Sequence, residues 1–165
     1  MEQEKYKKTN ITCQNPNSKN RVWRTLIKLE IFLHRMNKIK SLFLAAEDAM
    51  QNSYSPYSKF NVGASLLTKD GRIFQGTNVE NISYGLSICA ERVAIFVAIS
   101  NGYRDFTDMA IVTTSGKSTF PCGACRQVLM EFSPSLKIHL KGNRMRTVKL
   151  SKIYPNSFNS KQMTN

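Results

Sequence analysis

Three cysteines and one glutamate are the residues of this chain whose types and spacing could do chemistry. Glu91 stands two positions after Cys89, and Cys122 and Cys125 are three positions apart, directly after Pro121. A structural zinc site usually has four protein ligands, whereas a catalytic one has three and keeps a position for water. Zinc lowers the pKa of a bound water from about 15.7 to about 7, and a carboxylate can transfer that water's protons. The pattern predicts a hydrolytic site with one Zn²⁺ per chain, three cysteine ligands and Glu91 as proton shuttle.

Other uses of these thiols stay open at this point. A Cys-x-x-Cys pair alone fits a redox pair, half of a zinc ribbon or two core thiols. The redox interpretation leaves Cys89 and Glu91 unexplained, and a ribbon needs a second Cys-x-x-Cys, which the sequence lacks. Cys13, the remaining cysteine, could close the site as a fourth ligand. The spacing disfavours a disulfide framework, and clustered thiols suit a reducing compartment such as the cytoplasm.

Two helix starts are expected to bring the cysteines together. An apolar stripe and a terminal Asn-Gly pair predict a helix from Cys89 to Ser100, and a second helix is expected from Cys122 to Phe132. The partial positive charge at a helix N-terminus favours the thiolate form that binds metal. Arg92 and Arg126, which closely follow the cysteines, could moderate the negative charge of the cluster.

The remaining pattern predicts a mixed sheet covered by helices. A helix is expected from Asn37 to Gln51, because apolar residues recur there at helical spacing. Alternation and turn residues predict strands, and the residues between the first hairpin and the cysteine helix are expected to form a loop. The expected strands are 60–67, 72–77, 109–114, 136–140 and 145–150. This order predicts an α/β fold of three layers, α/β/α, with about five strands.

The two ends of the chain carry its positive charge. Residues 1–40 hold ten Lys or Arg and three acids, a net charge of +7. Residues 41–136 have a net charge of −1, and residues 137–165 hold seven basic residues and no acid. We expect solvated tails more than a nucleic-acid surface. Residues 1–20 are expected to be disordered and 22–35 to form a basic amphipathic helix, and no apolar stretch is long enough to span a membrane.

At this point the chain resembles the cytidine deaminases of the small homotetrameric class. The resemblance runs from about Met36 to about Phe158 and covers four motifs in order, which are Tyr57-Ser58-Lys59-Phe60-Asn61-Val62-Gly63-Ala64, Asn78-Val79-Glu80-Asn81, Cys89-Ala90-Glu91-Arg92 and Pro121-Cys122-Gly123-Ala124-Cys125-Arg126-Gln127. It implies a deaminase domain over 36–158. Residues 1–35 are then a basic extension, disordered or partly helical, and 159–165 a flexible tail.

The resemblance also implies substrate-binding residues. Asn78 and Glu80 match the pair that hydrogen-bonds the ribose 3′-hydroxyl, Phe60 matches the aromatic that packs on the pyrimidine, and the backbone of Ala90 matches a group that reads the base. Taken without the motifs, Asn78 would more simply cap a loop, Glu80 would be solvated, and Phe60 would belong to the core.

Two further matches concern assembly and one concerns the metal. Tyr84 and Phe158 match aromatics that reach a neighbouring subunit's site in the homotetramer, and Arg92 matches the arginine that hydrogen-bonds the ligand sulfurs. His34 is expected to face solvent and His139 to be a structural histidine.

The implied activity is the hydrolytic deamination of cytidine and deoxycytidine to uridine and deoxyuridine, a step of pyrimidine salvage in the cytoplasm. The expected partner is a small nucleoside, with no nucleic acid and no membrane. Three alternatives stay open: an editing enzyme acting on RNA or single-stranded DNA, a deaminase of a modified nucleoside such as blasticidin S, and a zinc module without activity.

Overall fold

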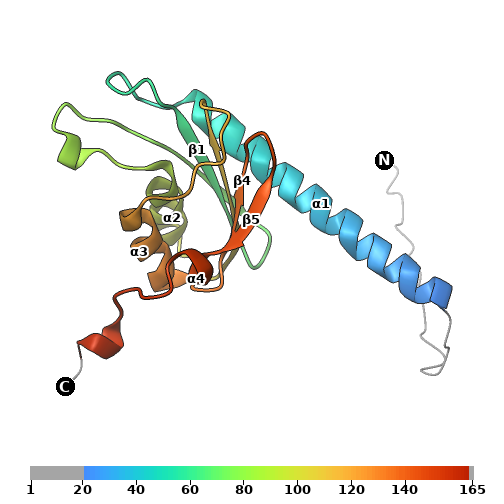
Figure 1. Ribbon diagram of the computed structural model, residues 1–165. Coiled ribbons are helices and arrows are strands. Elements are labelled where there is room, and N and C mark those ends of the chain that lie inside the picture. The colour runs from blue at the N-terminus through green and yellow to red at the C-terminus, as the bar shows by residue number, and fades with distance from the viewer. Residues whose placement is uncertain (1–20, 164–165) are drawn as a thin grey trace, which may run out of the picture. The chain divides into compact units, whose positions relative to one another are not determined.

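A computed structural model of the protein describes residues 21–163 (Figure 1). The chain divides into two compact units, Met1–His34 and Arg35–Asn165, and each is described by itself. Residues 1–20, for which disorder was expected, lie outside the described residues, and so does Cys13, the alternative fourth ligand. The expected tail, 159–165, is described only as far as Met163. Within 21–163, no helix is long and apolar enough to cross a membrane.

The first helix is longer than the sequence pattern predicted. We expected one helix over 22–35 and another over 37–51, but α1 runs without a break from Arg21 to Gln51. The stretch contains neither glycine nor proline, the residues that most strongly interrupt helices. In the first unit, large apolar side chains of this helix are exposed, among them Trp23, Ile31 and Phe32.

One mixed sheet of five strands forms the centre of the second unit, as predicted. Its order is β2-β1-β3-β4-β5, and the bounds are β1 Val62–Thr68, β2 Ile73–Thr77, β3 Phe106–Thr113, β4 Lys137–Leu140 and β5 Arg146–Lys149. β3 and β4 are parallel, and the other three pairs are antiparallel. The parallel pair requires a crossover, which α3 (Gly123–Phe132) provides.

Helices cover both faces of this sheet, which confirms the predicted three-layer class (Figure 1). Leu42 and Ala46 of α1 pack on Leu67, Ala110 and Val112 on one face. On the other face lie α2 (Ala90–Ser100), α3 and the short α4 (Leu150–Ile153). Ile95, Met109, Leu129, Ile138 and Leu150 are fully buried there. The larger of the two cores is therefore the one that holds the helices carrying the cysteines.

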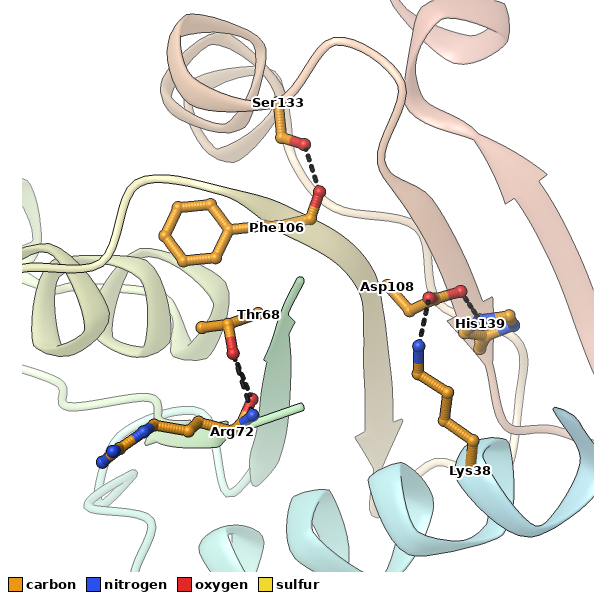
Figure 2. A network of polar contacts seen from close by, with 7 residues as sticks. All are labelled: Lys38, Thr68, Arg72, Phe106, Asp108, Ser133 and His139. Atoms are coloured by element: carbon orange, nitrogen blue, oxygen red, sulfur yellow. Dashed lines mark hydrogen bonds and ion pairs between the residues drawn. The ribbon is translucent and has the colours of Figure 1, made fainter. Parts of the chain in front are cut away.

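A polar network crosses the sheet on the α1 face (Figure 2). His139 is fully buried, and its two ring nitrogens lie 2.9 Å from Asp108 Oδ1 and 2.8 Å from Thr147 Oγ1. Lys38 Nζ lies 3.8 Å from the other oxygen of Asp108. Both nitrogens of the imidazole are thus satisfied, as a buried polar group requires. This arrangement agrees with the structural role expected for His139.

Elements near the C-terminus differ from the sequence-based expectation. Leu150 begins α4 instead of ending a strand, and a short 3-10 helix, η2, covers Ser160–Gln162. Asn159 caps η2 by accepting a hydrogen bond from the backbone N–H of Lys161 at 3.1 Å. A second 3-10 turn, η1 (Tyr84–Leu86), interrupts the loop expected between β2 and α2. Single turns of this kind leave no periodic apolar pattern that the sequence could reveal.

Candidate active site

Two helix starts bring the three cysteine sulfurs together, as predicted. Cys89 is the residue before α2, Cys122 is the residue before α3, and Cys125 lies in the first turn of α3. The Sγ atoms of Cys89 and Cys122 are 3.9 Å apart, those of Cys122 and Cys125 are 3.5 Å apart, and all three lie within 4.8 Å of one another. Zn–S bonds of about 2.3 Å in a tetrahedron place sulfurs about 3.8 Å apart. The donor set and its spacing therefore fit Zn²⁺.

The surroundings of the cluster favour a thiolate. A hydrogen bond from the Cys125 thiol lowers the pKa of Cys89 to about 5, and the nearby Arg92 acts in the same direction. Arg92 Nη2 lies 3.7 Å from Cys89 Sγ. Its Nε atom is buried and has no hydrogen-bond partner within the part of the chain that the structure describes. Arg92 thus lies where a cation stabilises negative charge on sulfur.

Arg126 does not take part in this cluster, contrary to our expectation. Its Nε atom donates to the carbonyl oxygen of Pro121 at 2.8 Å, and its Nη1 atom donates to that of Ile153 at 2.9 Å. The guanidinium therefore ties the start of α3 to the end of α4. Sequence proximity to Cys125 misled the prediction, because a residue one position along a helix points about 100° away from its neighbour.

Glu91 is the buried carboxylate beside the sulfurs. It lies in the first turn of α2 with 5% of its surface exposed. Burial raises the pKa of Glu91 to about 7, because the ionised form loses water. A carboxyl group with a pKa near neutrality can both accept and donate a proton, which suits general acid–base work.

A cavity of about 250 Å³ opens beside Glu91 and two of the cysteines. Six of its lining residues were proposed as site residues from the sequence, and the other six were given no site role there. The first group among its lining residues is Phe60, Asn78, Glu80 and Glu91, with Cys89 and Cys122. The second is Val62, Ser87, Ile88, Ile111, Thr119 and Phe120. The structure thus gathers segments from β1, β3, α2 and three loops around one small space.

Thr119 and Phe120 are the most informative of the residues that sequence reasoning missed. They lie in the loop between β3 and α3, directly before Pro121 and Cys122, and both line the cavity. Their position next to the cysteine motif was the available signal. The expected strand ends at 114 and the expected helix begins at Cys122, so the two residues fell between predicted elements and were given no role.

Asn78 and Glu80 hold the loops that border the cavity. Asn78 Nδ2 donates to the carbonyl oxygen of Phe60 at 2.9 Å, and its Oδ1 accepts from Val62 N at 2.8 Å and from Ser53 Oγ at 2.6 Å. These contacts fix the chain where it enters β1. Phe60 itself is half-buried at the cavity wall.

The carboxylate of Glu80 accepts three hydrogen bonds from one turn. Tyr57 N and Ser58 N donate to Oε2 at 3.0 and 3.2 Å, and Ser58 Oγ donates to Oε1. The hydrogen bond from the Ser58 hydroxyl lowers the pKa of Glu80, so the side chain is an anion at neutral pH. Lys59, next in the turn, has a φ of 57°, a conformation that few residues other than glycine adopt. Glu80 therefore organises the turn that leads to Phe60.

Three other residues singled out from the sequence, Ala90, Tyr84 and Phe158, do not line this cavity. Ala90 is fully buried at the start of α2. The side chains of Tyr84 and Phe158 are 71% and 57% exposed, and neither residue lines the cavity of its own chain. Tyr84 packs edge-on against Tyr57 with ring centroids 5.9 Å apart. The carbonyl oxygen of Phe158 accepts from Gln127 Nε2 of α3 at 2.8 Å.

Comparisons with known proteins agree with this geometry. The model of the "Cytidine and deoxycytidylate deaminase zinc-binding region" matches residues 36–139. A cytidine deaminase of Halalkalibacterium halodurans is 44% identical over 126 residues, which are 74% of this chain and 95% of the relative. A probable cytidine deaminase of Dictyostelium discoideum is 45% identical over 72% of this chain and 82% of its own length.

A solved structure shares the fold as well. The crystal structure of cytidine deaminase from Burkholderia pseudomallei superposes with a TM-score of 0.70 at 44% identity, covering 72% of this chain and 98% of that one. Sequence, fold and the three-sulfur cluster thus lead to one conclusion: the chain belongs to the cytidine and deoxycytidylate deaminase family of zinc-dependent hydrolases.

Proposed function

We propose that the protein hydrolyses cytidine and deoxycytidine to uridine and deoxyuridine, with release of ammonia, as a step of pyrimidine salvage. The observation that carries the proposal is the position of Glu91, a buried carboxyl group beside three convergent thiols at a small cavity. Relatives that are 44% and 45% identical to the chain are named a cytidine deaminase and a probable cytidine deaminase.

The chemistry follows from the groups that converge at the cavity. Cys89, Cys122 and Cys125 would hold Zn²⁺, which supplies the Lewis acidity that makes water nucleophilic near neutral pH. Glu91 donates a proton to ring N3 of the cytosine, accepts one from the attacking water, and passes a proton to the departing amino group. One water is consumed, the C4–N4 bond breaks, and ammonia leaves. A pKa of about 7 lets Glu91 serve in both directions without a large penalty.

The ribose is proposed to bind at Asn78 and Glu80, and the base between Phe60 and the backbone of Ala90. A carboxylate has about four lone-pair positions, and Glu80 uses three of them within the protein, which leaves one for a ribose hydroxyl. Both lone pairs of Asn78 Oδ1 are engaged, but Nδ2 donates only one of its two hydrogens to Phe60 O, so the second N–H can donate to a ribose hydroxyl. Phe60 would provide an apolar face for the pyrimidine.

Replacement of Glu91 by glutamine tests the role of the carboxyl group. Glutamine keeps the volume and removes the titrating proton, so Glu91→Gln should lower kcat for cytidine by about 10²–10⁴-fold, the usual contribution of general acid–base catalysis. Loss of cytidine absorbance in the ultraviolet measures the rate. Glu131→Gln, at an exposed position of α3, is the matched control and should retain full activity.

The two variants should bind zinc equally and unfold at similar temperatures, because neither replaces a sulfur ligand. Full turnover by Glu91→Gln would contradict the assigned role. Deamination of a cytosine-bearing oligonucleotide in preference to the nucleoside would contradict the proposed substrate class.

Tyr84 and Phe158 are proposed to complete the site of a neighbouring copy in a homotetramer. Their support is the exposure of both aromatic side chains on a protein whose cavity they do not line. Large exposed aromatics are enriched where proteins associate. Phe158→Ala should raise KM and weaken assembly, as measured by light scattering at a series of concentrations. A fully active wild-type monomer would refute the proposal.

A cytoplasmic location is proposed as well, supported by free thiols that suit a reducing compartment.

A further inference from the structure

A second, strongly basic pocket lies between two loops at the β4–β5 end of the sheet. It has a volume of about 460 Å³ and is lined by Lys117, Ser118, Asn143, Arg144 and Arg146, which we call the basic pocket. Two of its residues come from the loop between β3 and α3. The other three come from the turn between β4 and β5 and the first residue of β5.

Three cations of this pocket have no counter-charge among the residues that the structure describes. Within residues 21–163, Lys117, Arg144 and Arg146 form no ion pair, and no carboxylate lines the pocket. The neighbouring Lys141 differs, because it pairs with Glu47 of α1. Like charges around one hollow repel one another, and an anion that enters removes this cost.

The two loops that form the basic pocket are held together by close backbone contact. A Cβ atom at Gly142 would lie 2.4 Å from Ser118 N and 2.9 Å from the carbonyl carbon of Lys117, so only glycine fits there. Ser118 Oγ also donates to the carbonyl oxygen of Arg144 at 3.1 Å. The pocket therefore exists before a ligand arrives, which lowers the entropic cost of binding.

We propose that the basic pocket binds a small phosphate-bearing molecule. Guanidinium groups pair bidentately with phosphate oxygens, and lysine adds a point charge, so two arginines and one lysine suit a ligand with one to three phosphates. A single-stranded nucleic acid is the weaker match. The lining residues include no aromatic side chain on which bases could stack. This inference does not depend on the proposed deaminase activity.

The basic pocket is connected to the catalytic cavity by one short loop. Lys117 and Ser118 line the former, and Thr119 and Phe120, the next two residues, line the latter. A phosphate held between this loop and the β4–β5 turn restrains the segment that forms one wall of the catalytic cavity. Occupancy is therefore expected to change KM for the nucleoside more than kcat.

Calorimetric titration of the full chain with pyrophosphate tests the proposal. The variant Arg144→Gln/Arg146→Gln should weaken binding by about tenfold or more, whereas Lys69→Gln/Lys152→Gln removes the same charge elsewhere and should leave affinity within about twofold. All four positions are exposed, so both variants should fold. If the arginine variant has a lowered unfolding temperature, the single change Lys117→Gln replaces it.

Titrations with three phosphate ligands distinguish free from esterified phosphate, and their outcomes can also refute the proposal. Inorganic phosphate, pyrophosphate and a nucleoside triphosphate should all saturate the wild-type chain, and their relative affinities identify the free or esterified form. Equal loss of pyrophosphate binding in the two double variants would overturn the proposal, since it would indicate only general charge attraction. Absence of saturable binding, or binding of an oligonucleotide alone, would overturn it as well. A cytidine assay without activity would leave these results unaffected.

Discussion

The contact between β2 and α2 gives a quantitative test of how the fold positions the catalytic glutamate. A Cβ atom on Gly76 of β2 would lie 2.3 Å from Ala94 N and 2.4 Å from the carbonyl oxygen of Ala90. Both are backbone atoms of α2, so no side chain can rotate away to make room. Ordinary Cβ contacts begin near 3.4 Å, and α2 must therefore move by more than 1 Å to accept an alanine.

This displacement sets the expected size of the effect of Gly76→Ala. Overpacking of a core costs about 1–3 kcal/mol, and the rigid contact places this case at about 3 kcal/mol. For a chain of this length, such a loss lowers Tm by about 6–12 °C. Glu91 lies in the first turn of the displaced helix, and a misplacement of about 1 Å can lower the rate about 100-fold.

The assay for Gly76→Ala combines thermal unfolding with the rate of cytidine loss, corrected for the folded fraction. Gly85→Ala is the matched control, because its added Cβ meets no atom within 4 Å and its φ is not positive. This control should change Tm by less than about 2 °C, as surface substitutions usually do. A Gly76→Ala protein with the Tm and activity of the control would refute the reasoning that close packing of α2 on β2 fixes the position of Glu91.

Two further predictions concern acid and metal. Burial alone raises the pKa of Asp108, but the hydrogen bond from His139 and the nearby Lys137 outweigh it, and the net pKa is lowered. The resulting stability is present above the unfolded pKa of about 3.9 and is lost as pH falls through the lower folded value. As pH falls below about 4, the free energy of unfolding measured in urea should therefore decline less steeply in Asp108→Asn than in the wild type, whereas the exposed Asp105→Asn should behave as the wild type. Parallel declines in the wild type and both variants would contradict this prediction. Removal of metal by a chelator should lower Tm by about 5–10 °C, since a ligand at about 100 times its Kd adds about 2.7 kcal/mol. Zinc should restore both Tm and activity, and an unchanged Tm would argue against a metal held by the three thiols.

Much of the fold and the metal site could be predicted because local patterns determine them. Cys89 and Cys122 precede apolar helical stripes, and this placement alone brings sulfurs to helix starts. The hairpin of β1 and β2 follows from alternation and the turn residues around Gly71, whose φ is 96°. The strand order and the parallel β3–β4 pair were not specified, because they depend on contacts between distant segments.

Two kinds of feature could not be predicted from the sequence: contacts between segments far apart in the chain, and the continuation of one helix where two were expected. Arg126 was expected near sulfur and instead donates to the carbonyl of Ile153, a partner 27 residues away. The basic pocket joins Lys117 to Arg144, and nothing local to either residue indicates the pairing. The continuity of α1 was missed because two apolar patterns were interpreted as two helices, although no residue between them interrupts the helix.

The crossover from β3 through α3 to β4 has a consequence for the order of events during folding. Cys89 precedes β3 in the chain, whereas Cys122 and Cys125 follow it. The native spacing of the three thiols requires that β3 is paired with β1 and that α3 has returned across the sheet. We therefore expect tight zinc uptake by a refolding chain to report the completion of the native sheet.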